Sequence, residues 1–164
     1  MLQAAGLATA GVAIDQLSKS AAVGALATGP AHVGPLHLRL VANRGILMGI
    51  VEVPVWLITL VTALVVGFAA KALWRETTAR STAAYALLTA GAVGNLADRF
   101  LQRPDFPPNA VVDWLSFGGS TFNVADVLLV AAVLMLLAGA SDRPEHTAPT
   151  ATSGRASTDH VAHR

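Results

Sequence analysis

The chain has 164 residues, of which 54% are hydrophobic and only 13% charged, and its formal net charge is +1. This composition is more apolar than a soluble core needs, so it predicts a membrane protein, and with no basic cluster along the apolar body we expect no nucleic-acid partner. The absence of cysteine excludes disulfides and thiolate chemistry. The histidines lack a helical ligand spacing, so we expect no metal and no cofactor; they are His32, His37, His146, His160 and His163.

The first predicted element is a helix over residues 2–26, uncharged apart from Asp15 and Lys19. Because it has no basic n-region and no obvious cleavage site, we interpret it as a retained membrane span and not as a signal peptide. Residues 27–53 follow, with short alternating apolar runs broken by asparagine and glycine. This pattern predicts a small sheet or hairpin at the membrane surface.

The middle of the chain contains two further spans joined by a basic loop. The span expected over residues 54–73 contains a continuous apolar run from 54 to 70, and residues 80–98 are rich in small residues, which lets membrane helices pack closely. Lys71, Arg75 and Arg80 lie at this junction. Such a density of positive charge marks a cytoplasmic loop, so both termini are expected in the cytoplasm.

The last third of the chain contains a loop, a span and a tail. Residues 99–121 are rich in proline and glycine and predict a loop with one short strand at 110–114. Residues 122–140 are the fourth span, and residues 141–164 are expected to be a disordered cytoplasmic tail because they lack apolar periodicity. The predicted fold class is therefore an all-α membrane protein, with four transmembrane helices and a small extracytoplasmic β-sheet in one domain over residues 1–140.

This topology brings four carboxylates to the same side of the membrane. Asp15 lies in the later half of the first span, Asp98 at the end of the third, and Asp126 at the start of the fourth, while Asp113 lies in the connecting loop. A carboxylate at the bilayer centre costs about 2.5 to 3.5 kcal/mol, so such residues usually face a bundle interior or a water-filled cavity. The acids are thus predicted to converge near the outer leaflet.

Each of these acids also has a structural alternative. An acid near a helix end can sit among the headgroups or favour the helix N-terminus by its charge. Asp15 and Lys19, spaced i to i+4, can form a mutually neutralising pair that holds the first helix in the bundle. Hydrogen bonding between helices is the alternative for two polar pairs that share a helix face: Asn95 with Arg99, and Asn123 with Asp126.

The chemistry available to the cluster is limited. No serine nucleophile elbow, cysteine or histidine accompanies the acids, so an imidazole-activated nucleophile has no evident parts. Two carboxylates can instead share a proton, one acting as base on a water and the other donating to a carbonyl oxygen, because like charges about 3 Å apart cannot both ionise. The residues alone leave open which two of the four acids pair.

Five short motifs resemble the lipoprotein signal peptidase family, the signal peptidase II of bacteria. The resemblance covers residues 1–140 and implies a membrane aspartic endopeptidase that removes the signal peptide of diacylglyceryl-modified prolipoproteins, cutting just before the lipidated cysteine. It also implies a place in the bacterial cytoplasmic membrane, in contact with lipid, with the active site near the outer leaflet, and we expect a monomer. The motifs, in order, are DQLSK from Asp15, NRGILMG from Asn43, GNLADR from Gly94, VVDW from Val111 and FNVAD from Phe122.

The motifs assign roles residue by residue. By resemblance, Asp113 and Asp126 are the catalytic pair, without a decision as to which is base and which is acid. The resemblance also implies that Asn43 and Arg99 hold the substrate backbone and that Asn123 orients Asp126.

The remaining matched positions are expected to support the site. Asn95 belongs to the polar surroundings of the acids. A turn or close backbone approach is expected at three glycines, which are Gly45, Gly49 and Gly94. Asp15 and Lys19 match positions at the cavity edge, and Asp98 is expected to pair with a nearby cation.

Three departures from the family pattern bear on these roles. Residues 46–48 are Ile-Leu-Met where the family usually has two small residues and an aromatic. These residues are expected to form the edge of the outer sheet that faces the substrate, here called the substrate lip. The lip should be bulkier and more flexible in this chain and should accept a narrower range of substrates. Trp114 replaces the usual phenylalanine. The segment between the two acids is short, so Gly118 and Gly119 are expected to supply a tight bend.

Competing hypotheses remain at this point. A catalytically inactive relative shares the motifs but not the activity. A four-span carrier or binding protein would line a proton or cation path with its acids, yet it needs ionisable groups along the bilayer depth or internal repeats, and neither is evident here. A scaffold bundle predicts that the acids can be replaced with effects on stability alone.

Overall fold

The computed structural model describes residues 1–46, 51–75, 78–101, 103 and 106–141. Each of its four helices coincides closely with one of the segments predicted to span the membrane. The helices are α1 (Leu2–Ala25), α2 (Val55–Leu73), α3 (Ala79–Phe100) and α4 (Val124–Ser141). The strands are β1 (Ala31–Val33), β2 (Leu36–Asn43), β3 (Gly45–Ile46), β4 (Val51–Glu52), β5 (Val111–Phe117) and β6 (Ser120–Phe122).

Within the described ranges, one helix is both long and apolar enough to cross a membrane, Val55–Leu73, while Val124–Gly139 is a shorter apolar helix. α1 falls below this limit because of its buried acid and lysine, and α3 because of its charges and its many small residues. The count of four spans therefore remains a prediction.

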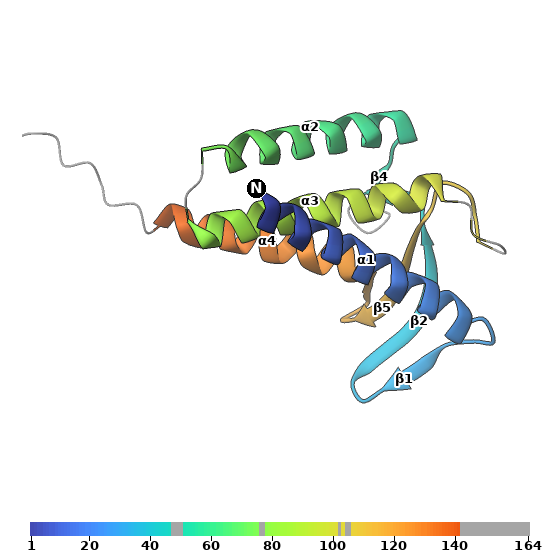
Figure 1. Cartoon of the computed structure of the whole chain (residues 1–164). Helices are drawn as coiled ribbons and strands as arrows, with labels where there is room; N and C mark the ends of the chain where they lie inside the picture. The colour runs from blue at the N-terminus through green and yellow to red at the C-terminus, as the bar shows by residue number, and fades with distance from the viewer. Residues whose placement is uncertain (47–50, 76–77, 102, 104–105, 142–164) are drawn as a thin grey trace, which may run out of the picture.

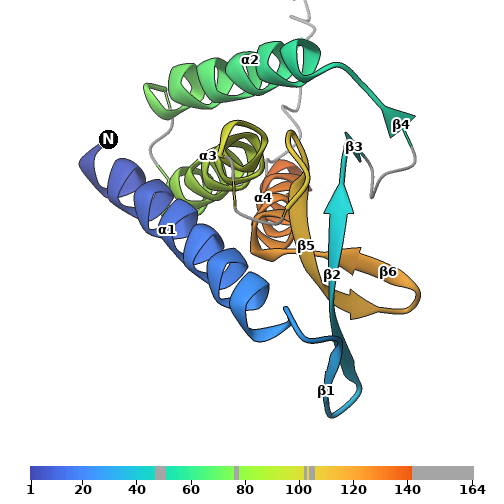
Figure 2. The ribbon, with the colours of Figure 1, turned by 90° about the vertical axis from the view of Figure 1, so that its right-hand side faces the viewer.

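Helix α3 is the centre of the bundle and packs against α1, α2 and α4 (Figures 1 and 2). The closest contacts between these helices occur at glycines, which have no side chain. A Cβ on Gly91 would lie 2.6 Å from the carbonyl oxygen of Ala125, and one on Gly94 would lie 2.7 Å from a carboxylate oxygen of Asp15. The expectation that Gly94 allows close backbone approach is thus confirmed, and the small residues of α3 let three helices meet around it.

Helix α2 stands apart from the other three (Figure 2). Its substantial helix packing is against α3, and Thr62 and Ala69 are its buried residues. Exposed apolar side chains cover much of its remaining surface, including Leu64 and Phe68.

The two segments predicted to lie outside the membrane build one sheet together. Its strand order is β1-β2-β5-β6 and its neighbouring strands are antiparallel, while β3 and β4 form a separate pair. The prediction of a single short strand at 110–114 is wrong in extent, because pairing with β2 and with β6 extends β5 to Phe117. Gly118 and Gly119 adopt positive φ values of 59° and 88° in the β5–β6 hairpin, so the predicted tight bend is confirmed.

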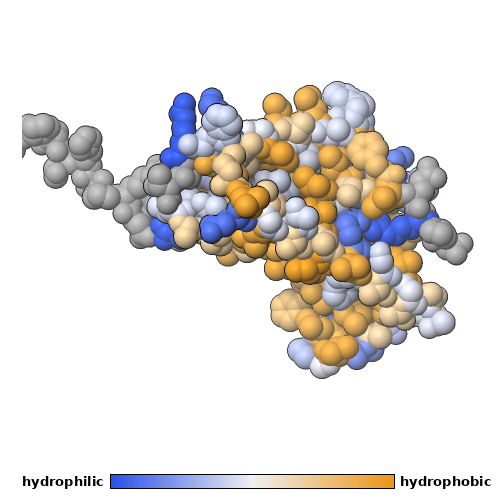
Figure 3. Space-filling model, in the orientation of Figure 1, coloured by the Kyte–Doolittle hydropathy of each residue, from blue (hydrophilic) through white to orange (hydrophobic). Residues whose placement is uncertain are grey.

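The helices expose apolar side chains and bury several polar ones. Apolar side chains cover the outside of the helices (Figure 3), where Leu64, Phe68 and Leu134 are each at least 60% exposed. Such a surface is expected where the solvent is hydrocarbon. The largest fully buried side chains are mostly polar or charged: Lys19, Val112, Asn123, Asp15, Asp98 and Asp113.

Two predictions concern parts outside this description. The substrate lip predicted at 46–48 lies outside the described residues, apart from the backbone of Ile46, and so does Gly49. The tail from residue 142, with its three histidines, also lies outside them. Of the other histidines, His32 and His37 face each other across β1 and β2, with ring centroids 4.4 Å apart.

Candidate active site

Asp113 is placed by the central strand of the sheet. β5 pairs with β2 so that Asp113 lies opposite Val41, and its side chain is almost fully buried. The carboxylate accepts two side-chain hydrogen bonds, from Asn43 Nδ2 at 2.9 Å and from Asn123 Nδ2 at 2.6 Å. Asn43 is itself fixed, because its Oδ1 accepts the backbone N–H of Gly45 at 3.0 Å. Both ends of the Asn43 amide thus have partners within the protein, and its predicted contact with substrate stays a prediction.

Asp126 is placed by the first turn of α4. Its backbone N–H donates to Oδ1 of Asn123 at 3.0 Å, and its own Oδ2 accepts the backbone N–H of Asn123 at 3.2 Å. This reciprocal pair is a capping box, in which Asn123 caps the helix and the acid three residues later returns the bond. Oδ1 of Asp126 accepts a further bond from Asn95 Nδ2 at 2.8 Å.

Asn123 therefore holds both acids at once. Its Nδ2 donates to Asp113 while its Oδ1 accepts from the backbone of Asp126. The sequence predicts that Asn123 orients Asp126, and the capping box gives that prediction a geometry. The bond from Asn123 to Asp113 was not foreseen, because it depends on β5 and β6 lying side by side.

The environment of Asp113 favours its protonated form. The pKa of Asp113 is raised to about 6. Burial is the main cause and the nearby charge of Asp126 adds to it, while the hydrogen bonds from Asn43 and Asn123 and the charge of Lys19 partly offset the rise. A carboxyl with this pKa exchanges its proton close to neutral pH. Such a group is suited to general acid–base work.

The two acids share one cavity of about 540 Å³. Apart from Thr62 of α2, the polar side chains of its wall are the two acids and their neighbours, and most of the remaining wall is apolar; these neighbours are Asn43, Asn95 and Arg99. An apolar chain can thus lie along the helices while a peptide bond reaches the carboxylates. The apolar wall is formed mainly by Leu57, Ile58, Val61 and Val65 of α2, Leu88, Ala92 and Leu96 of α3, and Leu129 and Val130 of α4.

Arg99 lies at the cavity wall and ties loops to α3. Its NH2 group donates to the carbonyl of Gly45 at 2.7 Å, and its NH1 group donates to the carbonyls of Asn109 at 3.1 Å and Arg44 at 3.3 Å. Its buried Nε has no hydrogen-bond acceptor among the described residues. The paired donors of Arg99 position the β3 region that contains Gly45, and its predicted contact with a substrate carbonyl stays a prediction.

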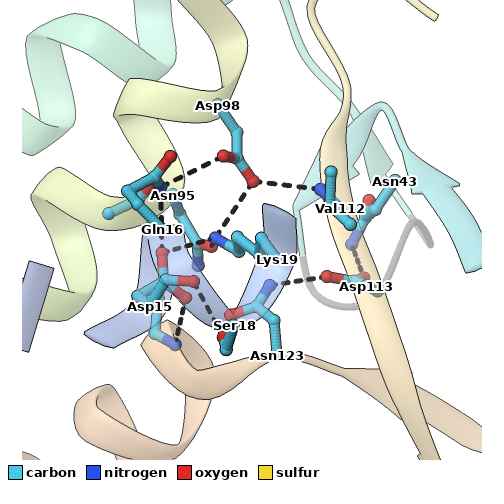
Figure 4. A network of polar contacts seen from close by, with 12 residues as sticks. Asp15, Gln16, Ser18, Lys19, Asn43, Asn95, Asp98, Val112, Asp113 and Asn123 are labelled. Atoms are coloured by element: carbon cyan, nitrogen blue, oxygen red, sulfur yellow. Dashed lines mark hydrogen bonds and ion pairs between the residues drawn. The ribbon is translucent and has the colours of Figure 1, made fainter. Parts of the chain in front are cut away.

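A buried ionic cluster lies behind the acids (Figure 4). Lys19 Nζ lies 2.8 Å from Oδ2 of Asp15 and 3.0 Å from Oδ2 of Asp98, and all three side chains are fully buried. Asp98 also pairs with Arg103 at 2.8 Å, so its expected pairing with a cation is confirmed. The cavity wall described above does not include Asp15 or Lys19. The two residues are predicted to lie at the cavity edge, and Lys19 reaches it only through Asn95, which lines the cavity and whose Oδ1 accepts a bond from Lys19 Nζ at 3.1 Å.

Gln16 is a member of this cluster that sequence reasoning missed. Its Nε2 donates to carboxylates of Asp15 and Asp98 at 3.0 and 3.1 Å and to the carbonyl of Gly94 at 3.0 Å, and its Oε1 accepts from Arg103 at 2.8 Å. A glutamine beside an acid–base pair in an apolar helix is the signal that could have found it.

Comparison with known proteins gives consistent matches. The family model described as signal peptidase (SPase) II matches residues 7–140. Proteins named lipoprotein signal peptidase are similar to the chain: one from Bifidobacterium adolescentis is 41% identical over 81% of this chain and 75% of its own length. One from Streptococcus pyogenes is 31% identical over 77% of this chain and 84% of its own. A bacterial membrane enzyme solved by the in meso method has a similar fold, with a TM-score of 0.77 and 21% identity over 91% of this chain and 93% of that one.

Proposed function

The chain belongs to the signal peptidase II family, a family of aspartic peptidases, and from this we propose that it removes the signal peptide from diacylglyceryl-modified prolipoproteins. The cut falls before the lipidated cysteine. The observation that carries the proposal is the pair of acids, Asp113 and Asp126, held by one asparagine at the polar end of an apolar cavity.

The proposed reaction needs one proton shared between the two carboxyls. One carboxylate takes a proton from a water, whose oxygen attacks the scissile carbonyl carbon, while the other carboxyl donates its proton to the carbonyl oxygen. When the tetrahedral intermediate collapses, the carbon–nitrogen bond breaks, the leaving amine takes the proton held by the first carboxyl, and a hydroxyl of the intermediate returns a proton to the second. The raised pKa of Asp113 supports this sharing, but the pair acts as one unit and neither role is assigned to one residue.

The neighbouring side chains have proposed supporting roles. Asn43, Asn95 and Asn123 hold the carboxylates at fixed orientations through their amide donors. Arg99 and Gly45 line the cavity next to the acids, and the guanidinium of Arg99 is proposed to hold the substrate backbone. The apolar wall suits a signal peptide and the acyl chains attached beside the cut.

The proposed topology has four spans with both termini in the cytoplasm. Lys71, Arg75 and Arg80 lie near the α2–α3 connection, which Figure 1 places at the opposite end of the helices from the sheet. The positive-inside rule puts this end in the cytoplasm, so the sheet and the two acids lie near the outer leaflet. Residues 141–164 are then a cytoplasmic tail, and we expect the domain over residues 1–140 to act as a monomer.

The topology can be tested because the chain has no native cysteine. Single cysteines at Ser120, in the β5–β6 hairpin, and at Thr78, at the start of α3, are exposed to a membrane-impermeant maleimide on intact cells. Labelling at position 120 and protection at position 78 is the expected result. The reverse pattern would invert the proposed orientation.

The activity is tested by cleavage of a diacylglyceryl-modified prolipoprotein with purified protein in detergent or lipid. The parent should cut, while Asp113→Asn and Asp126→Asn should not, although both keep a cooperative thermal transition. The same precursor without the lipid modification is the substrate control and should stay intact. A parent that cuts nothing would leave the inactive relative as the better account, and a folded variant that cuts at the parental rate would remove that acid from the mechanism.

A further inference from the structure

The two acids behind the site each hold the backbone just before a proposed catalytic residue. Asp15 Oδ1 accepts the backbone N–H of Ala125, which precedes Asp126, at 2.9 Å. Asp98 Oδ2 accepts the backbone N–H of Val112, which precedes Asp113, at 3.0 Å. The same kind of contact thus anchors α4 at one catalytic position and β5 at the other.

A single lysine joins these two anchors. Lys19 Nζ lies between the carboxylates of Asp15 and Asp98 (Figure 4), and its distances to them are 2.8 and 3.0 Å. Its third contact, 3.1 Å long, is with Oδ1 of Asn95, whose Nδ2 donates to Asp126. The lysine therefore touches the supports of both proposed catalytic acids while lying outside the cavity wall.

We propose that Asp15, Lys19 and Asp98 form a bracket that fixes the separation of Asp113 and Asp126, and that these three are positioning residues of the peptidase reaction. The proposal rests on the proposed function, because it takes the two acids as the reacting pair. α1 supplies two parts of the bracket, and it thereby sets the distance between a strand and a helix that are otherwise joined through Asn123.

Physical reasons favour positioning over simple stabilisation. Replacing a whole buried ion pair by apolar groups of similar volume is often neutral or stabilising, so a fold does not need charges at such a place, although removing one partner alone is strongly destabilising. Proton sharing between two carboxyls depends steeply on their distance, because their mutual repulsion is what keeps one of them protonated. A small change in geometry, of the order of 1 Å, can lower a rate by about 100-fold.

Arg103 provides a matched control. It also pairs with Asp98 at 2.8 Å, but through Oδ1, the oxygen that does not accept the Val112 amide. Its side chain is 13% exposed, and its other hydrogen bond goes to Gln16. Arg103→Met therefore removes a cation from the same carboxylate and leaves the bracket in place.

The first readout does not require activity. Hydrogen exchange of the backbone amides of Val112 and Ala125 is measured in detergent for the parent, Lys19→Met and Arg103→Met. Loss of the lysine should speed the exchange of both amides together, and loss of the arginine should leave both close to the parental rate. Unchanged protection in Lys19→Met, or loss of only one amide, would overturn the bracket whether or not the protein cleaves lipoproteins.

The second readout is kinetic and separates positioning from binding. Lys19→Met should lower kcat by about 100-fold while KM stays near the parental value, since the apolar part of the cavity wall is unchanged. Arg103→Met should keep most of the parental kcat. Equal losses in both variants, or an effect confined to KM, would overturn the positioning role.

The third readout is the pH dependence of the cleavage rate in Lys19→Met, which a loss of stability alone would not change in the way expected here. Loosening the bracket weakens the repulsion between the two carboxyls, so the two limbs of the bell-shaped profile should move towards each other. The charged and polar groups that face the pair are Lys19 of α1, Asn43 of β2, Asn95 and Arg99 of α3, and Asn123 before α4. A lower rate with an unchanged profile would count against the proposal.

A second substitution covers the case in which Lys19→Met does not fold. Asp98→Asn keeps an oxygen that can accept the Val112 amide but loses the ion pair with Lys19, and Asp15→Asn does the same for Ala125. If Asp15 and Asp98 both act through the lysine, the double variant with both substitutions should lose little more kcat than either single variant. Fully additive losses would show two independent effects and no bracket. A parent that fails to cleave, with coupled amide exchange intact, would refute the proposed function and leave the bracket standing as a structural unit.

Discussion

The buried carboxyl of Asp113 should make the stability of the protein depend on pH in a predictable way. Its pKa is about 6 in the folded protein against a reference value of 3.8. The difference of about two units corresponds to roughly 3 kcal/mol, because one unit is worth about 1.36 kcal/mol. The folded state binds the proton more tightly, so the free energy of unfolding falls as the pH rises from 3.8 to 6, and the full cost of the buried charge is present above pH 6.

Asp113→Asn removes this cost, since the amide has nearly the same shape and carries no charge. An asparagine at position 113 would still face two amide donors, from Asn43 and Asn123, but it has only one oxygen to accept them. It therefore loses one of the two hydrogen bonds, and this loss of stability does not depend on pH. The variant should therefore gain stability relative to the parent between pH 4 and pH 8, by up to about 3 kcal/mol, or about 6 to 12 °C in Tm for a protein of this size.

The assay is thermal unfolding of both proteins in one detergent at several pH values from 4 to 8. The difference in Tm between variant and parent is the measured quantity, because effects of pH on other groups cancel in it. A difference that stays constant over this range would refute the reasoning, since it would mean that Asp113 has the same pKa folded and unfolded. A difference that changes in the opposite direction would mean that the charged form is the one stabilised by the fold.

The remaining predictions concern helix packing and the cavity. Gly91→Ala should cost about 1 to 3 kcal/mol of stability, because its Cβ would lie 2.6 Å from the carbonyl oxygen of Ala125; Gly24→Ala, with nothing within 4 Å of its Cβ, should leave the Tm equal or higher. Equal effects at the two glycines would argue against close packing of α3 and α4. Ile58→Trp should fill the cavity and raise KM in the cleavage assay, whereas Leu60→Trp, on the half-exposed outer side of α2, should not; a KM that is unchanged in both variants would remove α2 from the substrate path.

The helices could be predicted from the sequence because their signal is local. An apolar run bounded by charge, such as residues 54–73, fixes a helix without knowledge of its neighbours. The sequence predicts where the strands of the sheet lie, but it does not predict which strands pair or in which register. The central register of the sheet, with Val41 opposite Asp113, joins strands far apart in sequence and contains an irregularity between Leu38 and Val41. Neither feature has a local signal.

The candidate site shows the same division. Topology predicts that four acids converge, but the structure divides them into a pair in the cavity, Asp113 and Asp126, and a pair behind it joined by Lys19. The spacing of Asn123 and Asp126 predicts a shared helix face, whereas the bonds between them form a capping box. Backbone amides as partners of buried carboxylates cannot be read from side-chain patterns, because they depend on which strand and which helix end meet in space.

The position of Asn123, directly between the end of β6 and the start of α4, has a consequence for the order of assembly. As the chain emerges from the ribosome, α1, the first strands, α2 and α3 all leave the exit tunnel before this residue does. Asp113 cannot gain its bond from Asn123 until the β5–β6 hairpin has closed, and Asp126 cannot gain its capping box until the last helix has begun. A nascent chain should therefore carry no formed peptidase site until nearly all of its membrane domain has been inserted, which keeps an unfinished protease from acting on other proteins in transit.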